Sequence, residues 1–134
     1  MNGPTVAIVG AGASGTIQAL HLLNEGAARV TLVEREREPG RGTAYGTRRP
    51  EHLLNVTAGR MSVWPDDPGQ FARWIEARGG AADDYARREA FGDYLAGLLA
   101  AAGERIEVAR GEAVDIVRRG GREVVRLRDG GTVE

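Results

Sequence analysis

The chain has 134 residues and a formal net charge of −1, from 18 basic and 19 acidic side chains. This length suits one domain, and the near balance of charge gives no electrostatic reason to expect nucleic acid or an anionic membrane as a partner. All basic side chains are arginine and there is no cysteine, which excludes Schiff-base lysines, disulfides and Cys-ligated zinc. With only His21 and His52 as imidazoles, we expect no metal site.

The N-terminal residues lack the usual targeting signals. The segment MNGPTVAIVG has no basic region, and its apolar run is too short for a signal peptide or a membrane span. We therefore expect a cytoplasmic protein with no membrane partner.

The first part of the chain has the pattern of a βαβ unit. Residues 6–9 are a short β-branched apolar run, typical of a strand buried on both faces. A helix is predicted from Ser14 to about Glu25, and Gly26 is placed to end it. Residues 29–33 predict a second strand. This order predicts two parallel strands joined by a right-handed crossover.

The middle of the chain predicts a long loop followed by two helices. Residues 36–66 show no sustained period and contain several glycines and prolines, with room for one short helical turn. Asp67 is a predicted N-cap, with Pro68 at the first helical position and Gln70 completing a capping box. The apolar face of this helix carries Phe71, Trp74 and Ile75. A second helix is predicted over residues 88–102, ended by Gly103.

The C-terminal part changes to a period of two. Residues 106–108 predict a strand, and residues 113–117, 123–127 and 132–134 predict an antiparallel meander with glycine-rich turns. The elements together predict an α/β fold, with helices on a parallel sheet and a small antiparallel meander.

A glycine-rich turn carries the chemistry of the predicted βαβ unit. Its form is G-x-G-x-x-G, a strand precedes it, a helix begins inside it, and Glu34 ends the next strand. The glycines allow a tight turn, leave room for a pyrophosphate and let the helix approach the strand, while the helix N-terminus stabilises phosphates. The predicted phosphate-binding residues are Gly10, Gly12, Ala13, Ser14 and Gly15.

Glu34 is the predicted ribose-binding residue. Its carboxylate can accept hydrogen bonds from a ribose 2′-hydroxyl and would repel the 2′-phosphate of NADP. This unit alone does not choose between FAD and NAD. The alternative is a glycine-rich turn that binds nothing, with Glu34 as a solvated strand end.

The sequence also resembles the FAD-NAD(P)-binding protein family, which is distantly similar to flavin monooxygenases and glutathione-reductase-type oxidoreductases. The segments that carry the resemblance are VAIVGAGASG, VERE, GRGTAYGT and PEHLLNVTAGRMSVWPDDPGQFARWI. It covers almost the whole chain and is most specific from Gly40 to Trp74. It implies a Rossmann-like domain over residues 1–134, FAD as the cofactor, and NAD(P)H as an electron donor to the complete protein.

The resemblance also implies individual contacts. Arg35 would lie along the adenosine or a phosphate of the cofactor. Gly42 and Thr43 match a Gly-Thr pair that approaches the pyrophosphate and the flavin side. Asn55 falls where related proteins bring a loop back over the isoalloxazine, and Val114 where the backbone meets the adenine.

Other conspicuous side chains receive weaker assignments. Arg60, beside a glycine in the long loop, is a candidate phosphate contact, and His52 is a weaker candidate for the flavin edge. His21 lies away from the glycine-rich turn and is predicted to be structural or solvated rather than catalytic. No catalytic residue can be placed.

The C-terminal meander favours FAD over NAD. A plain NAD-dependent dehydrogenase would more often continue with further βα units. In the family a further strand and a turn resembling A-T-G would follow DGGTVE, so we expect the N-terminal portion of a longer protein. The first strand would then have an exposed edge through which the chain could self-associate.

Three functions remain open. The leading hypothesis is the FAD-binding portion of a flavin-dependent oxidoreductase. The alternatives are an NAD-dependent dehydrogenase domain, or a nucleotide-binding regulatory module without catalysis.

Overall fold

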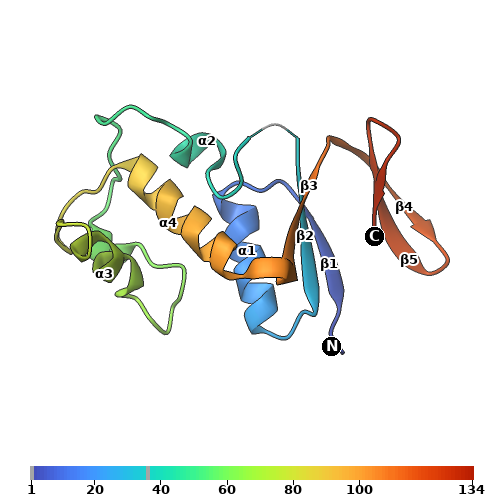
Figure 1. Ribbon diagram of the computed structural model, residues 1–134, viewed down its shortest axis with the longest axis horizontal. Coiled ribbons are helices and arrows are strands. Elements are labelled where there is room, and N and C mark those ends of the chain that lie inside the picture. Colours follow the sequence, from blue (N-terminus) through green and yellow to red (C-terminus); the bar gives the residue numbers. More distant parts are fainter. Residues whose placement is uncertain (1, 36) are drawn as a thin grey trace.

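The computed structural model describes residues 2–35 and 37–134, and its strands form two three-stranded sheets. The first sheet is parallel, with the order β1-β2-β3, and the second is antiparallel, with the order β4-β5-β6. The strands are β1 (Thr5–Val9), β2 (Arg29–Glu34), β3 (Ile106–Arg110), β4 (Ala113–Arg119), β5 (Arg122–Leu127) and β6 (Thr132–Val133). The predicted parallel sheet and meander are both confirmed (Figure 1).

The helices lie between the strands along the chain. They are α1 (Ala13–Asn24), α2 (Gly42–Tyr45), η1 (Ala58–Arg60), α3 (Gln70–Glu76), α4 (Arg88–Ala101) and η2 (Gly103–Arg105), of which η1 and η2 are 3₁₀ turns. Gly26 and Gly103 follow α1 and α4 with φ of +101° and +61°, which explains why glycine stands at both predicted helix ends. In the described part of the predicted loop, residues 37–66, there are two short helical segments where one was expected.

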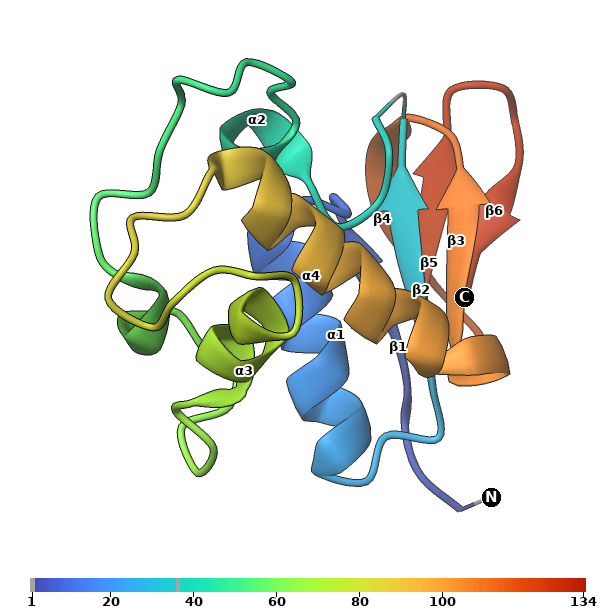
Figure 2. The same cartoon turned by 60° about the vertical axis from the view of Figure 1, so that its left-hand side comes forward.

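The parallel sheet is covered on both faces, α1 and α4 lying on one and the meander on the other (Figures 1 and 2). Side chains alternate along β2 accordingly. Val30 and Leu32 join the core with α1, whereas Val33 packs with Val125 and Leu127 of β5. A strand buried on both faces needs a continuous apolar run, as seen in this part of the sequence.

A second core lies beyond α4, on the side away from the sheet. Residues 46–87, here called the outer region, wrap around this side of α4 (Figure 2). Phe71 of α3 packs edge-to-face on Phe91 at 5.1 Å and lies 5.0 Å from the ring of Tyr94. These three rings are buried, so aromatic packing holds the outer region to the rest of the molecule.

The predicted capping box at the start of α3 is wrong. The helix begins at Gln70 after Gly69, and no side chain caps it. The carboxylate of Asp67 accepts a hydrogen bond from Arg73 at 2.6 Å, and Gln70 accepts one from the hydroxyl of Tyr94. Pro68 lies in the turn before the helix. These side-chain partners replace the local cap.

The strand β1 lies at one edge of the parallel sheet, since β2 is its only partner among the described strands. This agrees with the expected exposed edge, while self-association through it stays a prediction. Among residues 2–35 and 37–134, no helix is long and apolar enough to cross a bilayer.

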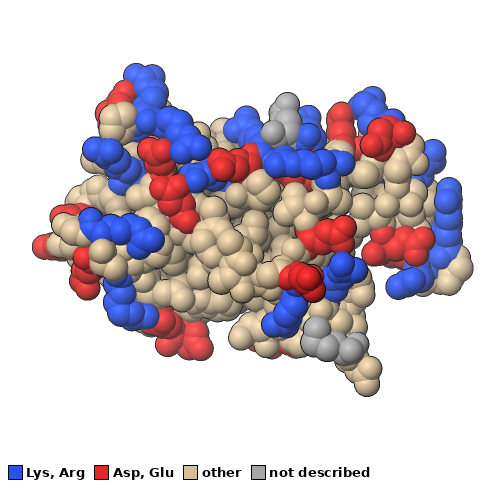
Figure 3. All heavy atoms as spheres, viewed as in Figure 1, with Lys and Arg blue, Asp and Glu red and all other residues tan. Residues whose placement is uncertain are grey.

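Charges of both signs are mixed over the face shown in Figure 3. On the meander, Arg118 lies 3.2 Å from Glu123, and Arg126 lies 3.5 Å from Asp115. Two arginines of the β4–β5 hairpin are thus paired with acids of the same hairpin.

Candidate dinucleotide-binding site

The glycine-rich turn fits α1 against β1 by close contact between backbones. Gly10 has φ +98°, and its N–H donates to the carbonyl of Val33 at 2.8 Å, which ties the turn to β2. A Cβ added to Gly15 would lie 2.0 Å from the carbonyl oxygen of Gly10. No side chain fits there, so this position requires glycine.

A second glycine loop, residues 38–46, packs directly on the first turn. The N–H of Gly40 donates to the carbonyl of Ala11 at 2.8 Å. Gly42 has φ +59°, and a Cβ there would lie 3.0 Å from the Cα of Gly12. The two loops therefore form one surface of exposed backbone.

The N-terminus of α1 opens onto this surface. Its first turn has no acidic residue and no side-chain cap, so no side chain of the helix itself compensates its positive end. Two adjoining depressions of about 490 and 340 Å³ lie here and share part of their lining. Nine of the eleven predicted site residues line them: Gly10, Gly12, Ala13, Ser14, Gly15, Glu34, Arg35, Gly42 and Thr43.

Glu34 is a buried carboxylate at the end of β2, only 7% exposed. Its Oε1 accepts a hydrogen bond from the N–H of Ala11 at 3.3 Å, and its Oε2 accepts one from the N–H of Arg37 at 3.2 Å. These bonds fix the carboxylate beside the first glycine turn. A carboxylate has about four acceptor sites, so a group of this kind is suited to accept hydrogen bonds from a diol.

The end of β3 supplies part of the lining that sequence reasoning missed. The N–H of Gly111 donates to the carbonyl of Glu34 at 3.1 Å, which brings residues 111–113 beside the depression. Val114, predicted to face the adenine, lies outside the lining and is 49% exposed. The sign that could have revealed this segment is the pairing of the third parallel strand with β2. That pairing sets Arg110 beside Glu34, so the residues after Arg110 lie next to the end of β2.

Glu112 is the charged member of that missed segment. Its carboxylate accepts two hydrogen bonds from the guanidinium of Arg128, at 2.7 and 3.2 Å. The hydrogen bond and charge of Arg128 hold the pKa of Glu112 below its usual value. The acid therefore stays ionised at the rim of the depression.

Arg41, also missed from the sequence, joins the second glycine loop to α4. The side chain is buried and lines the smaller depression. It forms ion pairs with Glu38 at 3.0 Å and with Asp93 of α4 at 2.5 Å. A Cβ on Gly92 would lie 2.7 Å from the Arg41 guanidinium, so the glycine makes room for it. The residue before Gly42 is thus anchored on a helix of the core.

Asn55 is placed away from this site. The N–H of Leu54 donates to the carbonyl of Ala86 at 2.9 Å, which holds this part of the loop against the segment just before α4, within the outer region. Asn55 itself is exposed and outside the lining of both depressions. The same holds for Arg60 in η1.

The two histidines make local contacts. His52 Nδ1 lies 2.7 Å from the hydroxyl of Thr47. His21 Nε2 lies 2.6 Å from the carbonyl of Val63, and its ring packs on Trp64 at 4.9 Å. These contacts fit the predicted structural role of His21.

Residues 7–134 match the FAD-NAD(P)-binding family. The chain belongs to this family. No curated protein matches it.

Solved structures of monooxygenases and of a thioredoxin reductase share the fold. The chain is 21% identical to a flavin-containing monooxygenase from Stenotrophomonas maltophilia, with a TM-score of 0.66 over 98% of the chain and 36% of that protein. A closed cyclohexanone monooxygenase is 18% identical, with a TM-score of 0.62 over 98% of the chain and 24% of that protein. A thioredoxin reductase from Bacillus anthracis, described as putative, is 11% identical, with a TM-score of 0.54 over 97% of the chain and 33% of that protein. The chain thus spans between a quarter and just over a third of these proteins.

Proposed function

We propose that this chain binds FAD and is the cofactor-binding portion of a flavin-dependent oxidoreductase. The observation that carries the proposal is the backbone contact between the two glycine loops at the start of α1, beside a buried carboxylate. A Cβ on Gly42 would crowd the Cα of Gly12, and a Cβ on Gly15 would clash with the carbonyl of Gly10 and push α1 away from β1. Bare backbone at both places fits a site built for a pyrophosphate at the start of a helix.

Each part of the cofactor has a matching part of the lining. Glu34 would hold the adenosine ribose through hydrogen bonds to its hydroxyls. The amides from Gly12 to Gly15 and the loop at Gly42 and Thr43 would hold the pyrophosphate. Residues 111–113, rather than Val114, would face the adenine. When bound, the flavin supplies the redox chemistry, while these residues bind and orient it.

Two features favour FAD over NAD. The second glycine loop extends the binding surface beyond the βαβ unit, and the meander follows β3 directly. In a plain NAD-dependent dehydrogenase we would expect further βα units after the third parallel strand. The buried acid by itself serves either cofactor.

The visible spectrum of the chain, purified after incubation with FAD, tests the proposal. We expect flavin absorption to remain with the protein and FAD to raise its melting temperature, while NADH leaves that temperature unchanged. Glu34→Gln should weaken FAD binding about tenfold, because a charged acceptor for the ribose hydroxyls is lost. The control, Glu25→Gln, changes an exposed acid at the far end of α1 and should leave FAD binding unchanged. A chain stabilised by NADH but not by FAD would contradict the proposal.

A further inference from the structure

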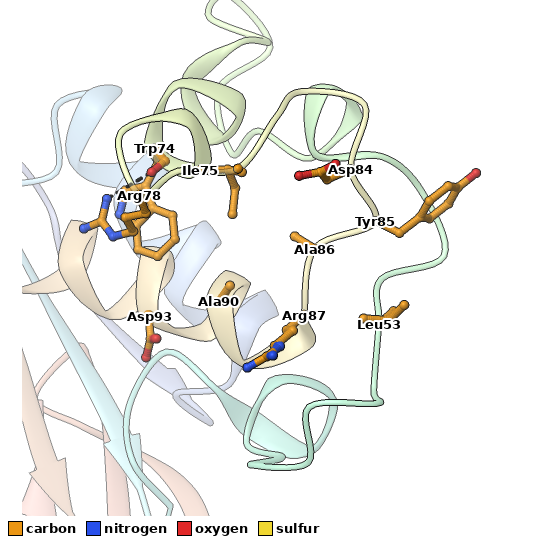
Figure 4. Close-up of a pocket in the computed structure, with 11 residues that line it drawn as sticks. Leu53, Trp74, Ile75, Arg78, Asp84, Tyr85, Ala86, Arg87, Ala90 and Asp93 are labelled. Atoms are coloured by element: carbon orange, nitrogen blue, oxygen red, sulfur yellow. Dashed lines mark hydrogen bonds between the residues drawn. The ribbon is translucent and has the colours of Figure 1, made fainter.

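A separate cavity of about 700 Å³ lies in the outer region, between α3, α4 and the segment that joins them. Figure 4 shows Trp74 and Ile75 from α3 on one side, Ala90 from α4 below, and Ala86 opposite Trp74. It shares no lining residue with the two depressions at the glycine turn. We propose that this cavity is a second binding site, for a small molecule that joins a flat apolar group to an anionic group.

The walls of the cavity account for the apolar part of the ligand. Ile75 and Ala86 are almost fully buried and contribute apolar lining. Trp74 offers an indole ring, with the guanidinium of Arg78 lying 3.5 Å from the ring centroid. A ring system can pack on such a surface, because a flat apolar group makes extensive contact with aromatic and aliphatic side chains. The volume falls within the range of about 300–1,000 Å³ that is usual for small-molecule pockets.

The charges around the cavity account for the anionic part. Of its two acids, Asp93 is paired with Arg41, and Asp84 accepts a hydrogen bond from the N–H of Ala81 at 2.8 Å. Arg78 and Arg87 supply the positive charges. In the described part of the chain Asp84 has no arginine partner, so Arg78 and Arg87 together exceed its charge by one positive charge.

Arg87 is the side chain available to an anion. Within residues 2–35 and 37–134, its guanidinium has no hydrogen bond or ion pair; the residue lies at the start of α4, bridged to Leu53 of the long loop. Figure 4 shows it lying beneath Ala90 on the side of Asp93. Guanidinium groups bind carboxylate and sulfonate groups through two parallel hydrogen bonds, so Arg87 would hold the anionic end.

A concave site with a free guanidinium fits a small molecule better than a protein partner. Leu53 and Tyr85 are the large exposed apolar side chains at the rim, 46% and 57% exposed. Figure 4 shows the ring of Tyr85 pointing away from the other lining residues. The apolar side chains that face one another lie inside the cavity and are Trp74, Ile75 and Ala86.

Titration of the whole chain with anilinonaphthalene sulfonate, an aromatic anion that fluoresces in apolar sites, tests this assignment. We expect saturable binding that FAD does not displace. Arg87→Gln should weaken it about tenfold, because a charge-assisted hydrogen bond is lost. Arg119→Gln is the matched control. It removes the same charge from an exposed site on β4, where no ion pair is found among the described residues, and should leave binding unchanged.

Two further measurements locate the probe. Ala90→Leu should block binding by filling the cavity, with circular dichroism verifying that the variant folds. Amide signals of residues 74, 86 and 90 should shift in NMR spectra, while those of residues 10–15 stay in place. Equal weakening by the two arginine variants, displacement by FAD, or loss of binding on self-association of the chain would overturn the proposal. The last outcome would assign the cavity to a contact between copies.

Discussion

The glycine loops beside β1 and the aromatic cluster beyond α4 join parts of the chain by opposite means. At the glycine loops backbones touch, and a single added carbon at Gly15 would lie 2.0 Å from an oxygen. In the aromatic cluster side chains fill the space, and Phe71 is fully buried among other rings. One region should therefore fail when an atom is added, and the other when atoms are removed. The two kinds of substitution therefore distinguish the glycine loops, which form the proposed binding surface, from the aromatic cluster, which supports the outer region.

The largest effect is expected from Phe71→Ala in the aromatic cluster. The change leaves a cavity between α3 and α4 and should lower the free energy of unfolding by about 3–5 kcal/mol. Urea denaturation measures this loss. Phe71 lines neither depression, so FAD affinity of the folded fraction should stay within about twofold of the parent chain, a difference of less than 0.5 kcal/mol. A variant that unfolds no more easily would show that the cluster does not support the outer region.

Gly15→Ala should give the next largest effect. Here an atom is added rather than removed, and binding should be lost together with stability. The added Cβ pushes against the carbonyl of Gly10, which should lower the free energy of unfolding by about 3 kcal/mol and abolish dinucleotide binding. Thermal denaturation and FAD titration measure the two losses.

Gly97→Ala is the matched control for this prediction. Gly97 lies in α4 with nothing within 4 Å of an added Cβ, so alanine should stabilise the helix by about 0.5–1 kcal/mol. FAD binding should not change. Equal loss of binding in both variants would remove the special role of the glycine turn.

Features set by neighbouring residues could be predicted from the sequence, whereas contacts between distant residues could not. The glycine turn was predictable, because its signal lies within one βαβ unit that ends at Glu34. The ion pair of Arg41 with Asp93 was not, because it joins residues 52 positions apart whose meeting depends on how α4 packs. The start of α3 was mispredicted for a related reason. Asp67 accepts a hydrogen bond from Arg73 instead of capping the helix, and a local sequence pattern cannot tell which of two such partners the side chain will bind.

Asp93→Asn tests the contact that joins the two regions. The change weakens the ion pair with the buried Arg41, and should lower the free energy of unfolding by about 1–2 kcal/mol, since Asp93 is half exposed. The loop at Gly42 keeps only the weaker contact of Arg41 with the carbonyl of Glu89 on α4, so FAD affinity should fall as well. Adenosine binding should be unaffected, because adenosine has no pyrophosphate to contact this loop. An equal fall for FAD and adenosine would mean that the whole site is disturbed.

The smallest effect is expected at the rim of the depression, from Glu112→Gln. The hydrogen bond from Arg128 lowers the pKa of Glu112, so the folded state favours the ionised acid. That contribution is present above the unfolded pKa of about 4.3 and is lost as the pH falls through the lower folded value. Glu112→Gln should therefore lower the melting temperature slightly at neutral pH.

The difference between Glu112→Gln and the parent chain should disappear in acid, once Glu112 is protonated in the folded state. Melting curves recorded from neutral pH down through this range measure the convergence. Glu104→Gln is the control, since it changes an exposed acid in η2 for which no ion pair is found in residues 2–35 and 37–134. A constant difference across this range would show that Glu112 acts through packing rather than charge. Convergence would show that this rim is held electrostatically, unlike the backbone contacts of the glycine loops and the packed rings beyond α4.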